Sequence, residues 1–184
     1  MDEVSALRRE IQMLRDELEA IKVTLDVVGT IDLDSGILNR TGVLDALERG
    51  QKWLIRRGDI YGLIVVAFPA LSDEVLFGDG AVEFRTHVTA TIGAAIREVD
   101  SVGRLNETTF AVALADLEPG TIEIVAARMK DLLDRLAAST PAMGGAFRIS
   151  GVEVLSALPS GNVLGRALQL NAEADPGPVI ARLE

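Results

Sequence analysis

Few side chains in this sequence could perform chemistry by themselves. The chain has no cysteine and a single histidine, His87, which lies in a helical pattern and is expected to be structural. Disulfides, thiolate metal sites and cysteine nucleophiles are therefore excluded, and a Ser-His-Asp triad is disfavoured. Asp73, Glu74 and Asp79 lie in a predicted loop, where we expect them to be solvated and not bound to a metal ion. No nucleophile stands beside a base, so the residues alone do not indicate an enzyme.

The connection between two predicted strands carries residues that a tight turn does not favour. The apolar runs at 101–105 and 110–115 are joined through Asn106, Glu107, Thr108 and Thr109. A two-residue hairpin turn favours Asn-Gly because both central positions need positive φ. We therefore expect Glu107 to be tolerated only where the backbone relaxes from the tight form.

The composition limits the elements that could position these residues. The 184 residues are 48% hydrophobic, enough for one ordinary globular core. The net charge of −10 argues against nucleic acid as the main partner, since phosphate binding depends on clustered Lys and Arg. A nucleotide ligand remains open, because one pocket needs only one or two arginines. No apolar run approaches the roughly 20 residues of a membrane span, and the charged N-terminus does not resemble a signal peptide. We expect a cytoplasmic protein without membrane insertion.

Residues 1–29 are predicted to form a parallel dimeric coiled coil. Apolar residues alternate at spacings of three and four without a break, which is the a/d pattern of a left-handed coiled coil. The a residues are Val4, Ile11, Leu18 and Leu25, and the d residues are Leu7, Leu14, Ile21 and Val28. Four heptads span roughly 40 Å, long for a helix that caps its own domain. An amphipathic helix packed on its own domain is the alternative.

The charges beside this seam favour a homodimer. In a parallel pair, each g residue faces the e residue five positions later on the partner. Every such pairing here joins a glutamate to a base, with Glu3, Glu10 and Glu17 at g and Arg8, Arg15 and Lys22 at e. Exposed pairs contribute a few tenths of a kcal/mol each, so they select partner and orientation more than stability.

Residues 30–184 are predicted to form one α/β (α+β) domain with a mixed sheet flanked by helices. Helical patterns cover 42–58, 82–99, 121–138 and 162–174. Strand patterns cover 61–68, 101–105, 110–115 and 147–155, and 178–183 could add an edge strand. The stretch 71–80 is predicted to be a loop.

Two segments of this domain resemble GGDEF domains, the diguanylate cyclases that make cyclic di-GMP from two GTP molecules. DLDSGILNR (32–40) resembles the family opening D-x-L-T-G-L-x-N-R, with Asp34-Ser35 in place of Leu-Thr. The stretch 97–114 resembles R-x-x-D-x-x-x-R-x-G-G-D-E-F-x-x-x-L. The resemblance covers about residues 30–175 and implies a GGDEF, nucleotidyl-cyclase-like fold, often found behind a dimerising helix.

The same resemblance implies that catalysis has been lost. The GGDEF pentad falls on Asn106, Glu107, Thr108, Thr109 and Phe110, and only Phe110 is retained. In the family the glycines admit the nucleotide, the third residue helps bind divalent metals and the fourth supports catalysis. A second metal-binding Asp corresponds best to Ala67, and the Asn-Asp pair that reads guanine is absent between 68 and 84. Mg²⁺ prefers carboxylate oxygens. We therefore predict a degenerate domain with no diguanylate cyclase activity, metal or cofactor.

Arg97 and Asp100 match a further family element, the R-x-x-D product-inhibition site five residues before the pentad. An arginine can bind phosphate or a guanine edge in a bidentate manner, and an aspartate can accept from guanine N–H groups. The alternative is a surface pair that closes a helix, worth about 0.5 kcal/mol or less. Arg104 could assist, although its family position is usually structural.

Three functional hypotheses follow. The first is a non-catalytic, dimeric receptor that binds cyclic di-GMP through Arg97 and Asp100. The second is a ligand-free dimerisation and protein-interaction scaffold. The third, GTP binding without turnover, ranks last because the Glu107 carboxylate would repel phosphates.

Overall fold

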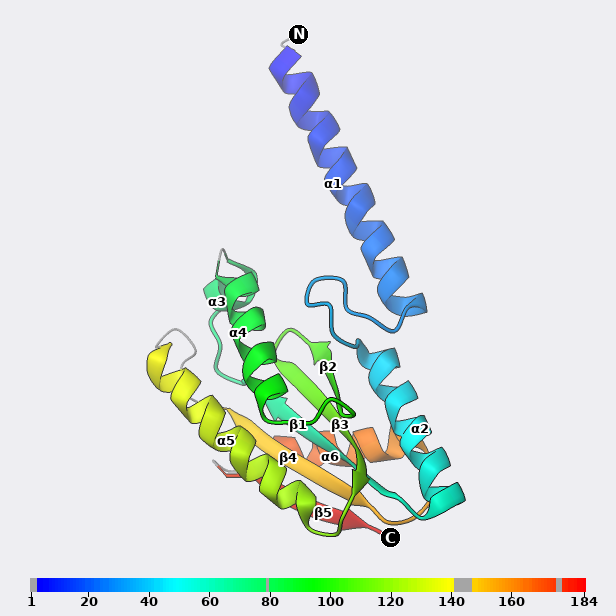
Figure 1. Cartoon of the computed structure of the whole chain (residues 1–184). Helices are drawn as coiled ribbons and strands as arrows, with labels where there is room; N and C mark the ends of the chain where they lie inside the picture. Colours follow the sequence, from blue (N-terminus) through cyan, green and yellow to red (C-terminus); the bar gives the residue numbers. More distant parts are fainter. Residues whose placement is uncertain (1–2, 79, 141–146, 175–176) are drawn as a thin grey trace.

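A five-stranded sheet with helices on both faces forms the globular part of the chain (Figure 1). The computed structural model describes residues 3–78, 80–140, 147–174 and 177–184. In spatial order the strands are β2 (Ser101–Asn106), β3 (Thr109–Leu117), β1 (Ile60–Ala67), β4 (Arg148–Val154) and β5 (Val179–Leu183). Strand β5 runs parallel to β4, and every other neighbouring pair is antiparallel. The predicted mixed sheet is confirmed.

The central strand β1 is buried on both faces, as its continuous apolar sequence predicted. Ile64 and Val66 contribute to a core shared with α4 (Ala81–Ala94) and α5 (Thr121–Ser139). Leu63 and Val65 point to the opposite face and pack with α2 (Arg40–Arg57) and α6 (Ser160–Glu173). The sheet therefore separates two cores, and β1 belongs to both.

Helix α2 has a well-defined cap at each end. The Asn39 side chain accepts a hydrogen bond from the Gly42 N–H at 3.0 Å, which satisfies one of the free donors of the first turn. Gly58 follows the last residue with φ 80, the left-handed conformation that glycine adopts at low cost. Arg56 and Arg57 lie in the last turn, where positive charge complements the helix dipole.

Two predictions about the middle of the chain were wrong. The stretch 71–80, predicted to be a loop, contains the short helix α3 (Asp73–Phe77). Its Val75 packs against the α4–α5 core, so burial compensates for the short length. The helix predicted to reach residue 99 ends at Ala94. The Asp100 carboxylate accepts the Arg97 backbone N–H, an alternative that competes with continuing the helix.

Helix α1 (Glu3–Val28) extends away from the globular part (Figure 1). Among its described side chains, Ile11, Leu14, Leu18 and Ile21 are 50 to 60% exposed. The a/d positions in this stretch are therefore not covered by the chain's own domain. No helix within the described residues combines the length and the apolar character that a membrane span requires.

Candidate functional site: the β2–β3 hairpin and its surroundings

The end of β1 lies directly beside the hairpin between β2 and β3. Ala67 pairs with Thr109 across the antiparallel β1–β3 ladder, and the Phe68 N–H donates to the Thr108 carbonyl at 2.9 Å. The structure thus brings Ala67 and Thr108, at positions that the resemblance assigns to metal binding, together with Thr109, at the position that it assigns to catalysis. These side chains offer a methyl group and two hydroxyls, a poor donor set for Mg²⁺.

The hairpin turn is centred on Glu107 and Thr108, one residue later than Asn106-Glu107. Neither residue has positive φ, which among the described non-glycine residues occurs only at Asp116. The strand register shifts between Arg104 and Asn106, and this irregularity accommodates the turn. The Asn106 Oδ1 accepts from the Thr108 N–H at 3.0 Å and from its hydroxyl at 3.2 Å, so Asn106 stabilises the turn through its side chain.

Arg104 connects the hairpin to the segment before α2. Its guanidinium pairs with Asp32 at 3.1 Å and with Glu107 at the turn, and its side chain is only 6% exposed. Its backbone N–H donates to the Leu38 carbonyl at 2.7 Å. The Glu107 carboxylate is therefore paired with a buried cation of its own domain.

The segment 32–40 contacts β2 and leads directly into the first turn of α2. Asp32 Oδ1 accepts from the Ser35 N–H at 2.8 Å and from the Ser35 hydroxyl at 2.6 Å. Leu38 forms a bridge to Gly103 on the outer edge of β2. Asn39 then begins α2 as its N-cap. Asp32, Leu38 and Asn39, three of the residues that match the family opening, thus have structural roles in this chain.

Phe110 lies in the α4–α5 core and is fully buried. Its ring meets Phe68 edge to face, with centroids 6.2 Å apart. The one residue of the pentad that the chain retains therefore anchors the hairpin to the core.

Arg97 and Asp100 lie together in the turn between α4 and β2. Asp100 Oδ2 accepts the Arg97 N–H at 2.9 Å and lies 3.6 Å from Arg97 Nε, while Oδ1 accepts the Ala115 N–H at 3.2 Å. Arg97 Nη2 donates to the Ala115 carbonyl at 2.7 Å. The Asp100 side chain is 1% exposed and that of Arg97 is 51% exposed. A ligand can reach Arg97, but it must displace internal contacts to engage Asp100.

Comparison with solved structures identifies the fold. No family model and no curated protein matches the chain. The diguanylate cyclase SiaD of Pseudomonas aeruginosa, solved with its activator SiaC, aligns with 97% of this chain and 72% of its own at 17% identity and a TM-score of 0.67. The coiled coil and GGDEF domain of Caulobacter crescentus DgcB, in complex with c-di-GMP, aligns over 97% of both chains at 18% identity and 0.63.

A third similar structure belongs to a longer protein. The S helix-GGDEF-EAL portion of Vibrio cholerae LapD, bound to c-di-GMP, aligns with 97% of this chain at 16% identity and a TM-score of 0.67. This chain spans 40% of that one. At these identities the likeness shows the fold alone: the chain has the GGDEF, nucleotidyl-cyclase-like α+β fold that its sequence predicted.

The second half of α2 carries a surface feature that the sequence pattern does not indicate. Residues 49–57, in the second half of α2, contain four basic residues and no acidic one. Their spacing predicts only a helix, and the net charge of −10 averages over this local cluster of positive charge. A count of charge in short windows along the chain reveals the cluster.

Proposed function

We propose that this chain is a non-catalytic, dimeric signalling protein whose degenerate GGDEF domain acts as a protein-interaction scaffold. The observation that carries the proposal is the corner formed by Ala67, Thr108 and Thr109. Phosphoryl transfer depends on metal ions that offset the developing negative charge, and methyl and hydroxyl groups cannot hold such ions firmly. The nearest carboxylate on the turn, Glu107, is paired with Arg104.

The dimer part of the proposal rests on α1. Its a/d side chains between Ile11 and Ile21 are half exposed in the single chain, and a second copy would cover them. The glutamate–base pattern at g and e then favours a parallel arrangement with an identical partner.

Incubation of the purified chain with GTP and Mg²⁺ or Mn²⁺, followed by chromatography of the nucleotides, tests the loss of catalysis. We expect GTP to remain unchanged. Formation of cyclic di-GMP that disappears in a Thr108→Ala variant would overturn the proposal, because the hairpin would then support turnover.

Cyclic di-GMP recognition by Arg97 and Asp100 is the second candidate function. The two side chains lie together, Arg97 is half exposed, and the similar structures of DgcB and LapD hold c-di-GMP. Against it, both Asp100 oxygens already accept hydrogen bonds from the chain itself.

Titration calorimetry with cyclic di-GMP separates the two candidates. The scaffold predicts no heat. The receptor predicts binding that Arg97→Ala abolishes and that Arg166→Ala, a change of an exposed arginine on α6, leaves intact. Heat that is equal in wild type and Arg97→Ala would exclude this site as the receptor.

A further inference from the structure

The second half of α2 carries an exposed basic and aromatic surface in an otherwise acidic chain. Within nine residues there are four bases and no acid, against a net charge of −10 for the whole chain. Positions three and four apart share one side of a helix, so these residues form one surface, and all are exposed. We call it the basic–aromatic face; it consists of Arg49, Lys52, Trp53, Arg56 and Arg57.

Most of the cations on this face have no acidic partner. Arg57 pairs with Asp59 and lies over the Trp53 ring, with its guanidinium carbon 5.5 Å from the centroid. Arg49, Lys52 and Arg56 form no salt bridge with any part of the chain that the structure describes. Three exposed cations therefore remain available to an external anion.

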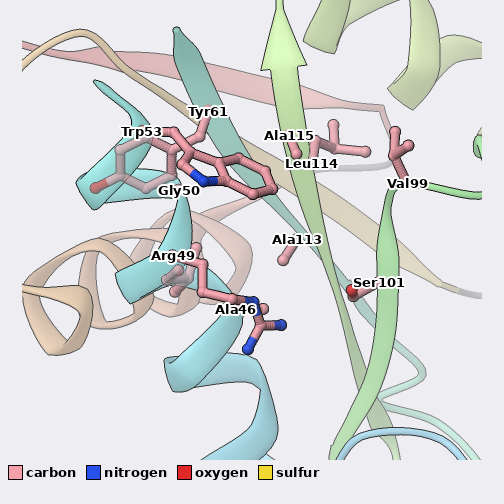
Figure 2. Close-up of a pocket in the computed structure, with 11 residues that line it drawn as sticks. Ala46, Arg49, Gly50, Trp53, Tyr61, Val99, Ser101, Ala113, Leu114 and Ala115 are labelled. Carbon is pink, nitrogen blue, oxygen red and sulfur yellow. The ribbon is translucent and has the colours of Figure 1, made fainter. Parts of the chain in front are cut away.

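The face borders a groove between α2 and the edge of the sheet (Figure 2). Trp53 stands on the helix side and Val99 on the strand side, and these side chains are 39% and 64% exposed. The floor between them is made of small residues such as Ala113 and Ala115. The sheet side of the groove begins two residues after Arg97, whose guanidinium bonds the Ala115 carbonyl.

The size and shape of this groove restrict its occupant. It encloses about 40 Å³, whereas pockets for small-molecule ligands commonly enclose about 300 to 1,000 Å³. A nucleotide is therefore too large, but one apolar side chain of a peptide fits. A bilayer surface cannot follow a concave floor between a helix and a strand, whereas a side chain of a peptide can enter it.

We propose that the basic–aromatic face and its groove bind an acidic segment of a partner protein. Carboxylates of that segment pair with Arg49, Lys52 and Arg56, and one apolar side chain enters the groove beside Trp53. Electrostatic complementarity of this kind raises the association rate and selects acidic partners over others. The inference rests on the proposed scaffold role and identifies the surface that performs it.

Trp53 provides a direct reporter, because it is the only tryptophan of the chain. The full chain is titrated with a synthetic peptide of glutamates around one central leucine, and the tryptophan emission is followed. We expect a saturable change that weakens as salt is added. The same peptide with the leucine replaced by glutamate should bind more weakly, since the groove then stays empty.

Two variants test whether the face is responsible. Arg49→Glu combined with Arg56→Glu should weaken binding about tenfold or more. Arg135→Glu combined with Arg166→Glu, an equal reversal of charge at two exposed arginines on α5 and α6, should leave it unchanged. An unchanged emission on titration, or equal weakening by both variants, would overturn the inference, while the GTP assay would still test the non-catalytic role separately.

A second copy of the chain is the competing occupant. Phe77 and Val82 are 70% and 63% exposed and lie in an acidic stretch, so they resemble the proposed ligand. If Trp53 emission changes with protein concentration alone, and Phe77→Ser removes that change, self-association replaces a foreign partner as the explanation. Emission that is independent of protein concentration supports the foreign partner.

Discussion

Arg104 links the hairpin turn to the segment before α2. It is buried, and its guanidinium joins Asp32 from the segment before α2 to Glu107 from the turn. The sequence predicts that Glu107 is unfavourable in a tight turn and that Arg104 has a structural role. It does not predict that the two side chains form an ion pair. The strand register also shifts between Arg104 and Asn106, an irregularity that turn propensity does not specify.

Removal of Arg104 should therefore cost far more stability than removal of the Glu107 charge. Arg104→Ala leaves Asp32 buried without its cation, and we expect the free energy of unfolding to fall by about 3 to 5 kcal/mol. Glu107 is 49% exposed, so Glu107→Gln should change it by no more than about 1 kcal/mol. Urea denaturation of both variants checks this. Equal losses of unfolding free energy in the two variants would show that the Asp32–Arg104 ion pair contributes no more to stability than the exposed Arg104–Glu107 pair.

Tyr61 should make stability depend on alkaline pH. It is buried, and its hydroxyl has no hydrogen-bond partner within the described residues. Burial raises the pKa of Tyr61 above its usual value of 10.0. The folded chain thus retains a proton that the unfolded chain loses, so stability is expected to fall as the pH rises above about 10.

Tyr61→Phe isolates this effect, because no other tyrosine is present. The variant should match wild type at neutral pH or exceed its stability by about 1 kcal/mol, since an unpaired buried hydroxyl is removed. It should also lose less stability in alkali. Denaturant titrations at neutral and alkaline pH measure both quantities, and identical alkaline losses in the two proteins would contradict the prediction.

At the scale of elements, apolar periodicity predicted every strand of the sheet and most helices, because burial determines both. β1 was recognised from its continuous apolar run and α5 from its spaced apolar residues. The errors lie where local side-chain contacts decide the outcome. The Asp100 carboxylate accepts the Arg97 N–H just after α4 ends, and Val75 of the short helix α3 packs against the core. Single contacts of this kind produce no periodic pattern of apolar residues, so the sequence does not predict them.

The contact of β2 with α2 should be intolerant of any added volume. A Cβ on Gly103 would meet Val43 Cγ2 and would lie 3.1 Å from the Leu38 carbonyl oxygen. We expect Gly103→Ala to reduce stability by about 1 to 3 kcal/mol through overpacking. Gly165→Ala on α6 is the matched control: a Cβ there has nothing within 4 Å, so stability should rise by about 0.5 to 1 kcal/mol. Thermal denaturation compares the two, and a neutral Gly103→Ala would mean that α2 moves freely against the sheet.

At the scale of the whole molecule, charge is distributed in a way that the composition concealed. The net charge of −10 is a sum over the whole chain, so it hides the local positive charge of the four bases on the basic–aromatic face. The sequence therefore predicts a site without the catalytic residue types of the family, which stays a prediction, and it gives no indication of the surface on α2. Absent residue types can be read directly from a sequence, whereas a candidate binding surface requires knowledge of which helix face is exposed.

The assembly of two such molecules should depend on one stripe of α1. Leu14 and Leu18 lie in the predicted seam and are 60% and 57% exposed in the single chain. Leu14→Glu with Leu18→Glu places four like charges into a dimer interface, and we expect sedimentation velocity to show a monomer. The helical signal should also fall, because most helical stability in proteins comes from packing of the amphipathic face, which the monomer loses. Met13, 65% exposed, lies outside the seam, so Met13→Glu should leave the dimer intact. A dimer that survives the double change would mean that α1 does not hold the two copies together, and the domain would have to associate through its own surface.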